Sequence, residues 1–197
     1  MGTFLLETQH LWLRAFRDAD LEAFVAYRSD PEVARYQGWD APYGADKAAA
    51  FIAEMSQKHP GTPGEWYQVA MELKGSSVLI ADCAFHILED ARQAEIGVTL
   101  SRPYQGQGYA TEAVTRLFGY LFGELGLHRV VALCDVENLA SARLLERLGM
   151  RREGCFQENI WFKGAWGSEY LYAILQKEWA GRPSAANHLR DLPSRKI

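Results

Sequence analysis

The chain has 197 residues, of which 48% are hydrophobic, and this suits a single domain with a core large enough to fold unaided. Its 21 basic and 25 acidic residues give a formal net charge of −4, which argues against a surface that binds nucleic acid or another polyanion. A cationic binding partner remains compatible with this charge. We expect one domain over residues 1–180, followed by a polar, flexible tail at 181–197.

Three cysteines, Cys83, Cys134 and Cys155, lie far apart in apolar surroundings. An odd number of separated cysteines favours reduced, buried thiols in a cytoplasmic protein. No segment reaches the length of a membrane span, and the first residues lack the basic stretch and apolar run of a signal peptide. We therefore expect a cytoplasmic protein that does not bind membranes.

The first half of the chain predicts helices followed by a meander of strands. In chain order, we expect a strand at 9–16, a helix from Asp18 or Asp20 to about 28, a short helical piece at 30–36, a helix at 46–58, and strands at 66–73, 78–88 and 94–100. The loop at 37–44 carries Trp39 and Tyr43, which either anchor it over the core or form the wall of a substrate site.

The most informative stretch runs from Gln105 to Ala113, between the strand at 94–100 and a helix with one apolar face. Two glycines and Ala110 leave the backbone nearly bare, so the amides of a turn and of the first helical turn can surround an anion. Thr111 stands where a dinucleotide-binding GxGxxG would need glycine, and the lysine of a P-loop is missing. The stretch predicts a phosphate site of another kind, with a plain helix-entry turn as the alternative.

The second half predicts an apolar central strand at 129–136, a helix at 138–148 that Gly149 terminates, and strands at 151–162 and 167–176. Because a strand, a helix and a strand follow each other, the strands at 94–100 and 129–136 should be parallel neighbours. Histidines are scattered without metal-ligand spacing, and no G-x-S-x-G motif is present. A site of backbone amides, a few polar side chains and an apolar groove fits a bound thioester cofactor, without a metal.

At this point the sequence resembles the GNAT acyltransferases, whose pyrophosphate signature [Gln/Arg]-x-x-Gly-x-[Gly/Ala] is matched by Gln105, Gly108 and Ala110. The resemblance covers most of residues 8–177 and is closest to the Rim-type ribosomal-protein N-terminal acetyltransferases. The motifs for this narrower match are Leu13-Arg14 with Asp20-Leu21, the run from Ser29 to Val33, and the run from Asn138 to Met150. The resemblance implies an α+β GNAT fold: a mixed, mostly antiparallel sheet of about seven strands with a central parallel pair, flanked by about four helices.

The resemblance also implies acetyl-CoA as co-substrate. Its expected contacts are Val98, Thr99, Leu100, Gln105, Gly106, Gln107, Gly108, Tyr109, Ala110, Thr111, Asn138 and Ser141. Asn138 and Ser141 lie three residues apart on one helix face, so both can point at one ligand, although Asn138 is equally suited to be only an N-cap.

In such enzymes an amine attacks the thioester directly, which requires a base and a proton donor for the thiolate. Leu145 stands where many GNAT enzymes have a tyrosine donor, so the resemblance assigns this role to Ser141, as in the Rim type. Ile160 stands where Rim-type members can have a glutamate base. Glu158, two residues earlier on the same predicted strand face, and Glu95, which matches a glutamate of many GNAT enzymes, are the two candidates, with a water relay as the third route.

The implied function is acetyl transfer to a primary amine, with a protein N-terminal α-amine as the expected acceptor. A small amine (aminoglycoside, polyamine or amino acid) and a non-catalytic acyl-CoA-binding module are the alternatives. A homodimer is left open.

Overall fold

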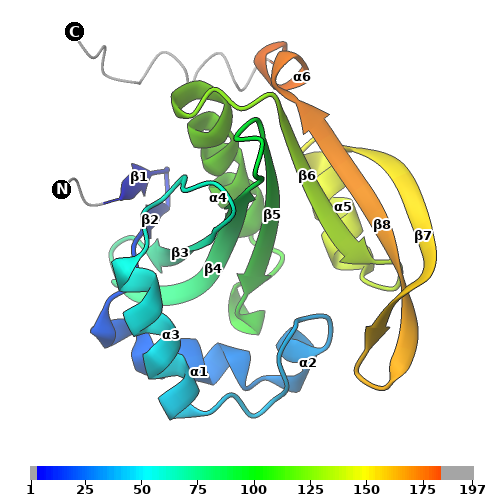
Figure 1. Cartoon of the computed structure of the whole chain (residues 1–197). Helices are drawn as coiled ribbons and strands as arrows, with labels where there is room; N and C mark the ends of the chain where they lie inside the picture. Colours follow the sequence, from blue (N-terminus) through cyan, green and yellow to red (C-terminus); the bar gives the residue numbers. More distant parts are fainter. Residues whose placement is uncertain (1–3, 183–197) are drawn as a thin grey trace, which may run out of the picture.

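The computed structural model describes residues 4–182, which form one eight-stranded sheet in the order β1-β2-β3-β4-β5-β6-β8-β7 (Figure 1). The strands are β1 Leu5–Glu7, β2 Leu11–Arg14, β3 Trp66–Leu73, β4 Val78–Ile87, β5 Gln93–Leu100, β6 Arg129–Asp135, β7 Arg151–Phe162 and β8 Ala165–Leu175. The helices are α1 Leu21–Arg28, α2 Pro31–Ala34, α3 Ala45–Gln57, α4 Tyr109–Phe118, α5 Leu139–Arg147 and α6 Gln176–Ala180. Short 3-10 turns, η1 Asp18–Asp20 and η2 Arg102–Tyr104, precede α1 and α4, and a π-helix, η3 Gly119–Glu124, continues α4.

The expected α+β fold is confirmed, and so is the parallel pair at its centre. β5 and β6 run parallel, whereas the other neighbouring strands of the sheet pair antiparallel. The predicted counts of about seven strands and four helices are too low. β1 was not predicted, and β8 begins two residues earlier than expected. α6 was not predicted either: its first residue, Gln176, was placed in the last strand, and residues 177–180 were assigned to no element. β1 has only three residues, too few to show a repeated alternation.

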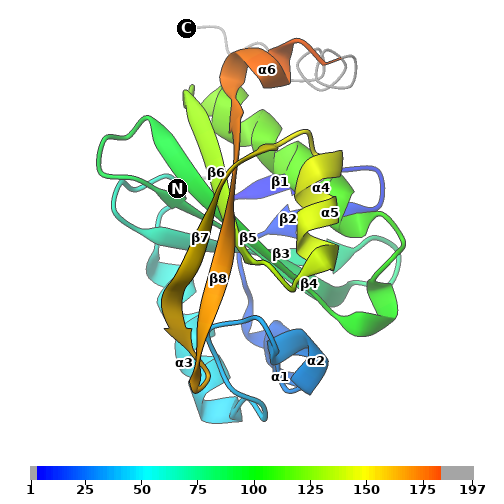
Figure 2. The same cartoon turned by 90° about the vertical axis from the view of Figure 1, so that its right-hand side faces the viewer.

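Helices cover both faces of the sheet (Figures 1 and 2). On one face α4 and α5 pack on the larger core, where Val114, Leu117 and Phe118 are almost fully buried. On the other face α1 and α3 enclose a smaller core, in which the Phe24 and Phe51 rings stack with centroids 5.3 Å apart. The apolar stripe that predicted the helix after the glycine turn is therefore the stripe that fixes α4 against the sheet.

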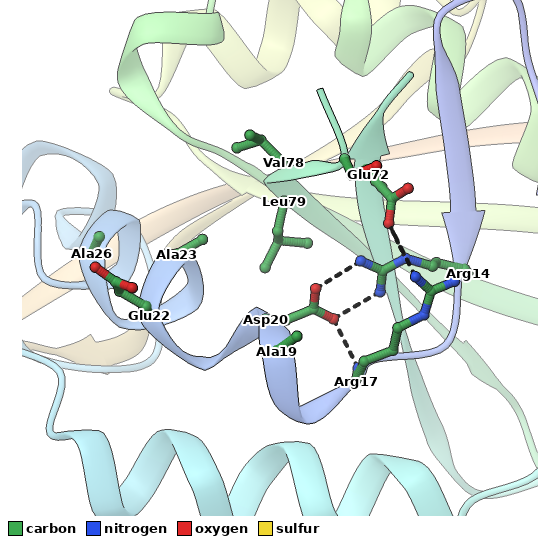
Figure 3. A pocket seen from close by; sticks show the side chains of 11 residues that line it. Arg14, Arg17, Ala19, Asp20, Glu22, Ala23, Ala26, Glu72, Val78 and Leu79 are labelled. Carbon is green, nitrogen blue, oxygen red and sulfur yellow. Dashed lines mark hydrogen bonds and ion pairs between the residues drawn. The ribbon is translucent and has the colours of Figure 1, made fainter. Parts of the chain in front are cut away.

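A buried ion-pair cluster fastens η1 to the sheet (Figure 3). Arg14 on β2 donates two hydrogen bonds of 2.7 Å to Asp20 and one of 2.6 Å from Nε to Glu72 on β3. These side chains border a cavity of about 500 Å³, but each of the three charges is paired. The cluster therefore serves to hold η1 against the sheet, because each of its charged side chains is already paired with another and none is available to a ligand.

The expectation of three buried thiols is wrong for one of them. Cys83 and Cys134 are buried, whereas Cys155 is exposed on β7, the edge strand of the sheet. The sequence around Cys155 contains apolar residues, but the strand that they form is largely exposed to solvent on both faces. Among residues 4–182, no helix is long and apolar enough to cross a membrane. Most of the predicted tail, residues 183–197, lies outside the described part of the chain.

Candidate active site

The site begins where β5 and β6 separate. Their parallel pairing covers three residues of each strand, ending at Glu95 and Val131, although both strands continue. The backbone of 96–100 is therefore left without a strand partner on the side toward β6. A groove of about 780 Å³ opens there. Its walls come from β5, β6, α2, α4, α5 and the glycine turn, and include Val98, Thr99, Leu100, Gln105, Gly106, Ala110, Asn138 and Ser141.

The glycine turn presents a row of free amides at one end of this groove. Gly106 and Gly108 have φ angles of 73° and 88°, a left-handed conformation that glycine adopts without strain, and Gly108 is the N-cap of α4. Within residues 4–182, the backbone amides from Gly106 to Ala110 have no hydrogen-bond acceptor. Side-chain bonds from Gln105 Nε2 to the Leu100 carbonyl (2.9 Å) and from Gln107 Nε2 to the Pro103 carbonyl (2.8 Å) hold the turn in place.

These features fit an anionic diphosphate. A Cβ atom added at Gly106 or Gly108 would meet nothing within 4 Å, so open space lies beside the unpaired amides. The positive end of the α4 dipole points the same way. Four of the predicted contacts, Gln107, Gly108, Tyr109 and Thr111, do not line the groove itself. Of these, Tyr109 packs against the rings of Tyr104 and His10.

Asn138 and Ser141 meet at the start of α5, on the opposite wall. Asn138 Oδ1 accepts a hydrogen bond of 3.1 Å from the Ser141 amide, so Asn138 is the N-cap of this helix, and both residues also line the groove. The Ser141 hydroxyl is therefore not used as a cap. Burial raises the pKa of the neighbouring Cys134 thiol, and a hydrogen bond with Ser141 opposes this shift. Leu145, in the position of the missing tyrosine, lines the same wall with its apolar side chain.

Glu95 lies at the point where β5 and β6 part. Its neighbours Ala94 and Ile96 belong to the core under α4, so the Glu95 side chain is on the opposite face of the sheet. Directly across on β4 is His86. Burial raises the pKa of Glu95, the negative charge of Glu169 raises it further, and His86 opposes the shift. A half-buried carboxylate with a raised pKa is suited to accept a proton.

Glu158 is placed differently. It is exposed and has a φ of 47°, in a bulge where residues 157–159 of β7 have no partner on β8. Its amide donates a 2.9 Å hydrogen bond to Ser168 Oγ. The bulge interrupts the alternation from which Glu158 was inferred to share a face with Ile160. The structure therefore does not bring Glu158 and Glu95 together as two equivalent candidates.

The part of the groove that α2 and the residues after it provide was not predicted from the sequence. Glu32, Val33, Tyr36 and Gln37 line the groove from this side. The turn between β7 and β8 is tied to the same region, because Lys163 Nζ donates 2.7 Å hydrogen bonds to the carbonyls of Ala34 and Trp39. The Asp30-Pro31 helix start was the available signal for α2, but nothing local showed which surface it would face.

The aromatic loop at 37–44 serves mainly as an anchor. Trp39 Nε1 donates a 3.1 Å hydrogen bond to the Arg28 carbonyl, and its ring lies 4.0 Å from the Arg28 guanidinium. Tyr43 is buried against Phe24. Neither ring lines the groove, so the contacts support the predicted anchoring role and not the wall of a substrate site.

A groove between diverging parallel strands, with free amides at a helix start, fits the acyl-CoA site that the resemblance to the GNAT acyltransferases implies. The comparisons agree: residues 10–151 match the acetyltransferase (GNAT) domain, and the chain belongs to this family. It is 35% identical to the uncharacterized N-acetyltransferase YnaD of Bacillus subtilis, over 88% of this chain and 98% of that protein.

Two further similarities are to a solved structure and to a ribosomal-protein acetyltransferase. The crystal structure of a GNAT-family acetyltransferase from Bacillus anthracis superposes with a TM-score of 0.80 at 32% identity, covering 89% of this chain and 100% of that one. The ribosomal protein uS5 alanine N-acetyltransferase of Escherichia coli is 30% identical over 84 residues, which is 43% of each chain. The protein is thus a GNAT N-acetyltransferase, an enzyme class that uses acetyl-CoA and acts on amines. No cluster of metal-ligating side chains occurs in residues 4–182.

Proposed function

We propose that this enzyme transfers the acetyl group of acetyl-CoA to the N-terminal α-amine of a protein, as the Rim type does. The observation that carries the proposal is the placement of Glu95, a half-buried carboxylate of raised pKa at the point where β5 and β6 separate. Support for a protein acceptor comes from the Rim-type motifs and from the similarity to the uS5 alanine acetyltransferase over part of the chain.

The residues on the two walls of the groove take separate tasks. The amides of 106–110 and the α4 dipole hold the pyrophosphate, and the unpaired backbone of Val98, Thr99 and Leu100 hydrogen-bonds the pantetheine arm. Asn138 and Ser141 face the arm from α5. These contacts fix the thioester without a protein nucleophile, so that the incoming amine is the only group that attacks it.

Glu95 accepts a proton from the acceptor's ammonium group, directly or through one water, and thereby frees the amine. The amine nitrogen bonds to the acetyl carbon, the carbon–sulfur bond breaks, and Ser141 Oγ gives its proton to the departing thiolate. The acylated nitrogen still holds one extra proton, which passes to the serine oxygen directly or through water, and Glu95 releases its own proton to solvent after the product leaves. Glu95 is better suited than Glu158 to the first step. It directly precedes Ile96 of the groove wall and partial burial raises its pKa, whereas Glu158 is solvated on a bulge.

The experiment is a thioester-consumption assay with acetyl-CoA and a panel of acceptors. The panel holds peptides with free N-termini, the same peptides with blocked N-termini, spermidine, an aminoglycoside and free amino acids. We expect turnover with free N-terminal peptides and mass-spectrometric localisation of the acetyl group on the α-amine. Turnover only with the small amines would refute the protein acceptor. Tight CoA binding without turnover of any amine would instead indicate a non-catalytic module.

A further inference from the structure

An ion pair across the rim of the groove joins the phosphate-binding turn to α2. Arg102, in the η2 turn three residues before Gln105, has its Nε 3.0 Å from Oδ2 of Asp30, the N-cap of α2. Figure 1 shows α2 close to the end of β5, from which η2 continues. Two segments that are far apart in the chain are thus held together at the mouth of the site.

The two partners differ in how firmly they are fixed. Asp30 uses its other oxygen, Oδ1, to accept a 3.0 Å hydrogen bond from the Glu32 amide, and its side chain is only 20% exposed. The Arg102 side chain is 63% exposed and lines the groove beside Gln105 and Gly106. Arg102 is therefore the more exposed partner of a carboxylate that a second hydrogen bond holds, next to the free amides of the glycine turn.

Exposed ion pairs of this kind are weak, because solvent screens them and both side chains lose freedom. A guanidinium binds phosphate oxygens through two parallel, charge-assisted hydrogen bonds, which are stronger and more directional. A diphosphate beside Gln105 and Gly106 thus offers Arg102 a better partner than Asp30, within the same groove.

We propose that Arg102 is a cofactor-binding residue that exchanges Asp30 for the pyrophosphate of acetyl-CoA when the cofactor binds. The inference rests on the proposed function, which places the pyrophosphate at the amides of 106–110. Asp30 then competes with the cofactor for Arg102, because it holds the guanidinium at the rim while the groove is empty. The Arg102–Asp30 ion pair must break when the cofactor binds, and the free energy of that pair lowers the affinity for the cofactor.

The alternative is that the pair only ties the turn to α2. The two roles predict different changes in CoA affinity for the same pair of variants. If Arg102 and Asp30 form a structural tie, Arg102→Ala and Asp30→Asn break the same contact and change CoA affinity in the same direction. If Arg102 changes partner, Arg102→Ala loses the phosphate contact, whereas Asp30→Asn removes the competitor. Asparagine is as good an N-cap as aspartate, so α2 is preserved in Asp30→Asn.

The test is calorimetric titration of the whole enzyme with CoA, which needs no acceptor and no turnover. We expect Arg102→Ala to weaken binding about tenfold or more, as loss of a charge-assisted bidentate contact does, and Asp30→Asn to tighten it a few-fold. Arg143→Ala is the matched control, because Arg143 is an exposed α5 arginine that does not line the groove. It should leave the affinity unchanged. Arg102→Lys, which keeps the charge but not the planar fork, should fall between wild type and Arg102→Ala.

A second titration with 3′-dephospho-CoA separates the pyrophosphate from the ribose phosphate. The same loss in Arg102→Ala with both ligands supports the pyrophosphate, whereas a loss that disappears with 3′-dephospho-CoA overturns that assignment. Equal affinities, or parallel losses in Arg102→Ala and Asp30→Asn, overturn the exchange while leaving the proposed function intact. Failure of the wild-type enzyme to bind CoA would refute the proposed function and the exchange with it.

Discussion

Replacing Glu95 by glutamine tests the assignment of the base. The change keeps the size of the side chain and an oxygen that accepts hydrogen bonds, but removes its ability to take a proton. A positioned general base contributes about 10²–10⁴-fold to a rate, so kcat should fall by a factor in this range while CoA affinity stays within a few-fold. Glu158→Gln is the matched control, and because Glu158 is solvated it should retain most of wild-type kcat.

The pH dependence follows from the same carboxylate. Burial and Glu169 raise the pKa of Glu95, and the base works only when ionised. The kcat/KM of the wild-type enzyme should therefore decrease as the pH falls through an acid limb that lies above the ordinary pKa range of glutamate. Glu95→Gln should have no such limb. Steady-state kinetics with one N-terminal peptide between about pH 5 and pH 9 measures both enzymes.

The substitution Glu95→Gln should lower the activity of the enzyme but not its stability. Because the pKa of Glu95 is raised on folding, the folded protein binds this proton more tightly than the unfolded chain, and ionised Glu95 lowers the free energy of unfolding at about pH 7. Glu95→Gln should be at least as stable as wild type there, and its advantage should shrink as the pH falls from the raised pKa of folded Glu95 toward the ordinary pKa of glutamate, below which it should be absent. A Glu95→Gln enzyme with wild-type kcat, while Glu158→Gln is inactive, would refute the assignment of Glu95 as the base.

Substitutions at three further positions test the rest of the site and its support. Ser141→Ala should lower kcat by about 10²-fold with little change in CoA affinity, measured where chemistry limits the rate; an unchanged kcat there would exclude Ser141 as the proton donor. Gly108→Asp should abolish measurable CoA binding by calorimetry, whereas Gly108→Asn, a neutral side chain that tolerates the left-handed φ of 88°, should bind more tightly than the aspartate variant. Asp20→Ala should lower the free energy of unfolding by about 3 kcal/mol in urea titration, because it leaves the buried Arg14 guanidinium with one carboxylate, and a loss below about 1 kcal/mol would contradict the view that the cluster is a buried tie.

The sequence by itself determined the central unit of this protein. An apolar strand, a turn containing Gly106 and Gly108, and an amphipathic helix are each set by residues close in the chain, and together they require β5 and β6 to be parallel neighbours. The two glycines also predicted a turn with a nearly bare backbone, because the lack of a Cβ atom is a property of the residue itself. The left-handed φ angles of Gly106 and Gly108 are seen only in the structure.

Only the tertiary structure decided which side chains reach the groove. The strands β5 and β6 separate after Glu95, and the bulge in β7 turns Glu158 to solvent. Lys163 and Arg102 contact the region of α2, which is distant from both of them in the chain. Periodicity places a residue on one face of its own strand or helix, but it carries no information about where a strand stops pairing or which neighbour a long, exposed side chain will reach.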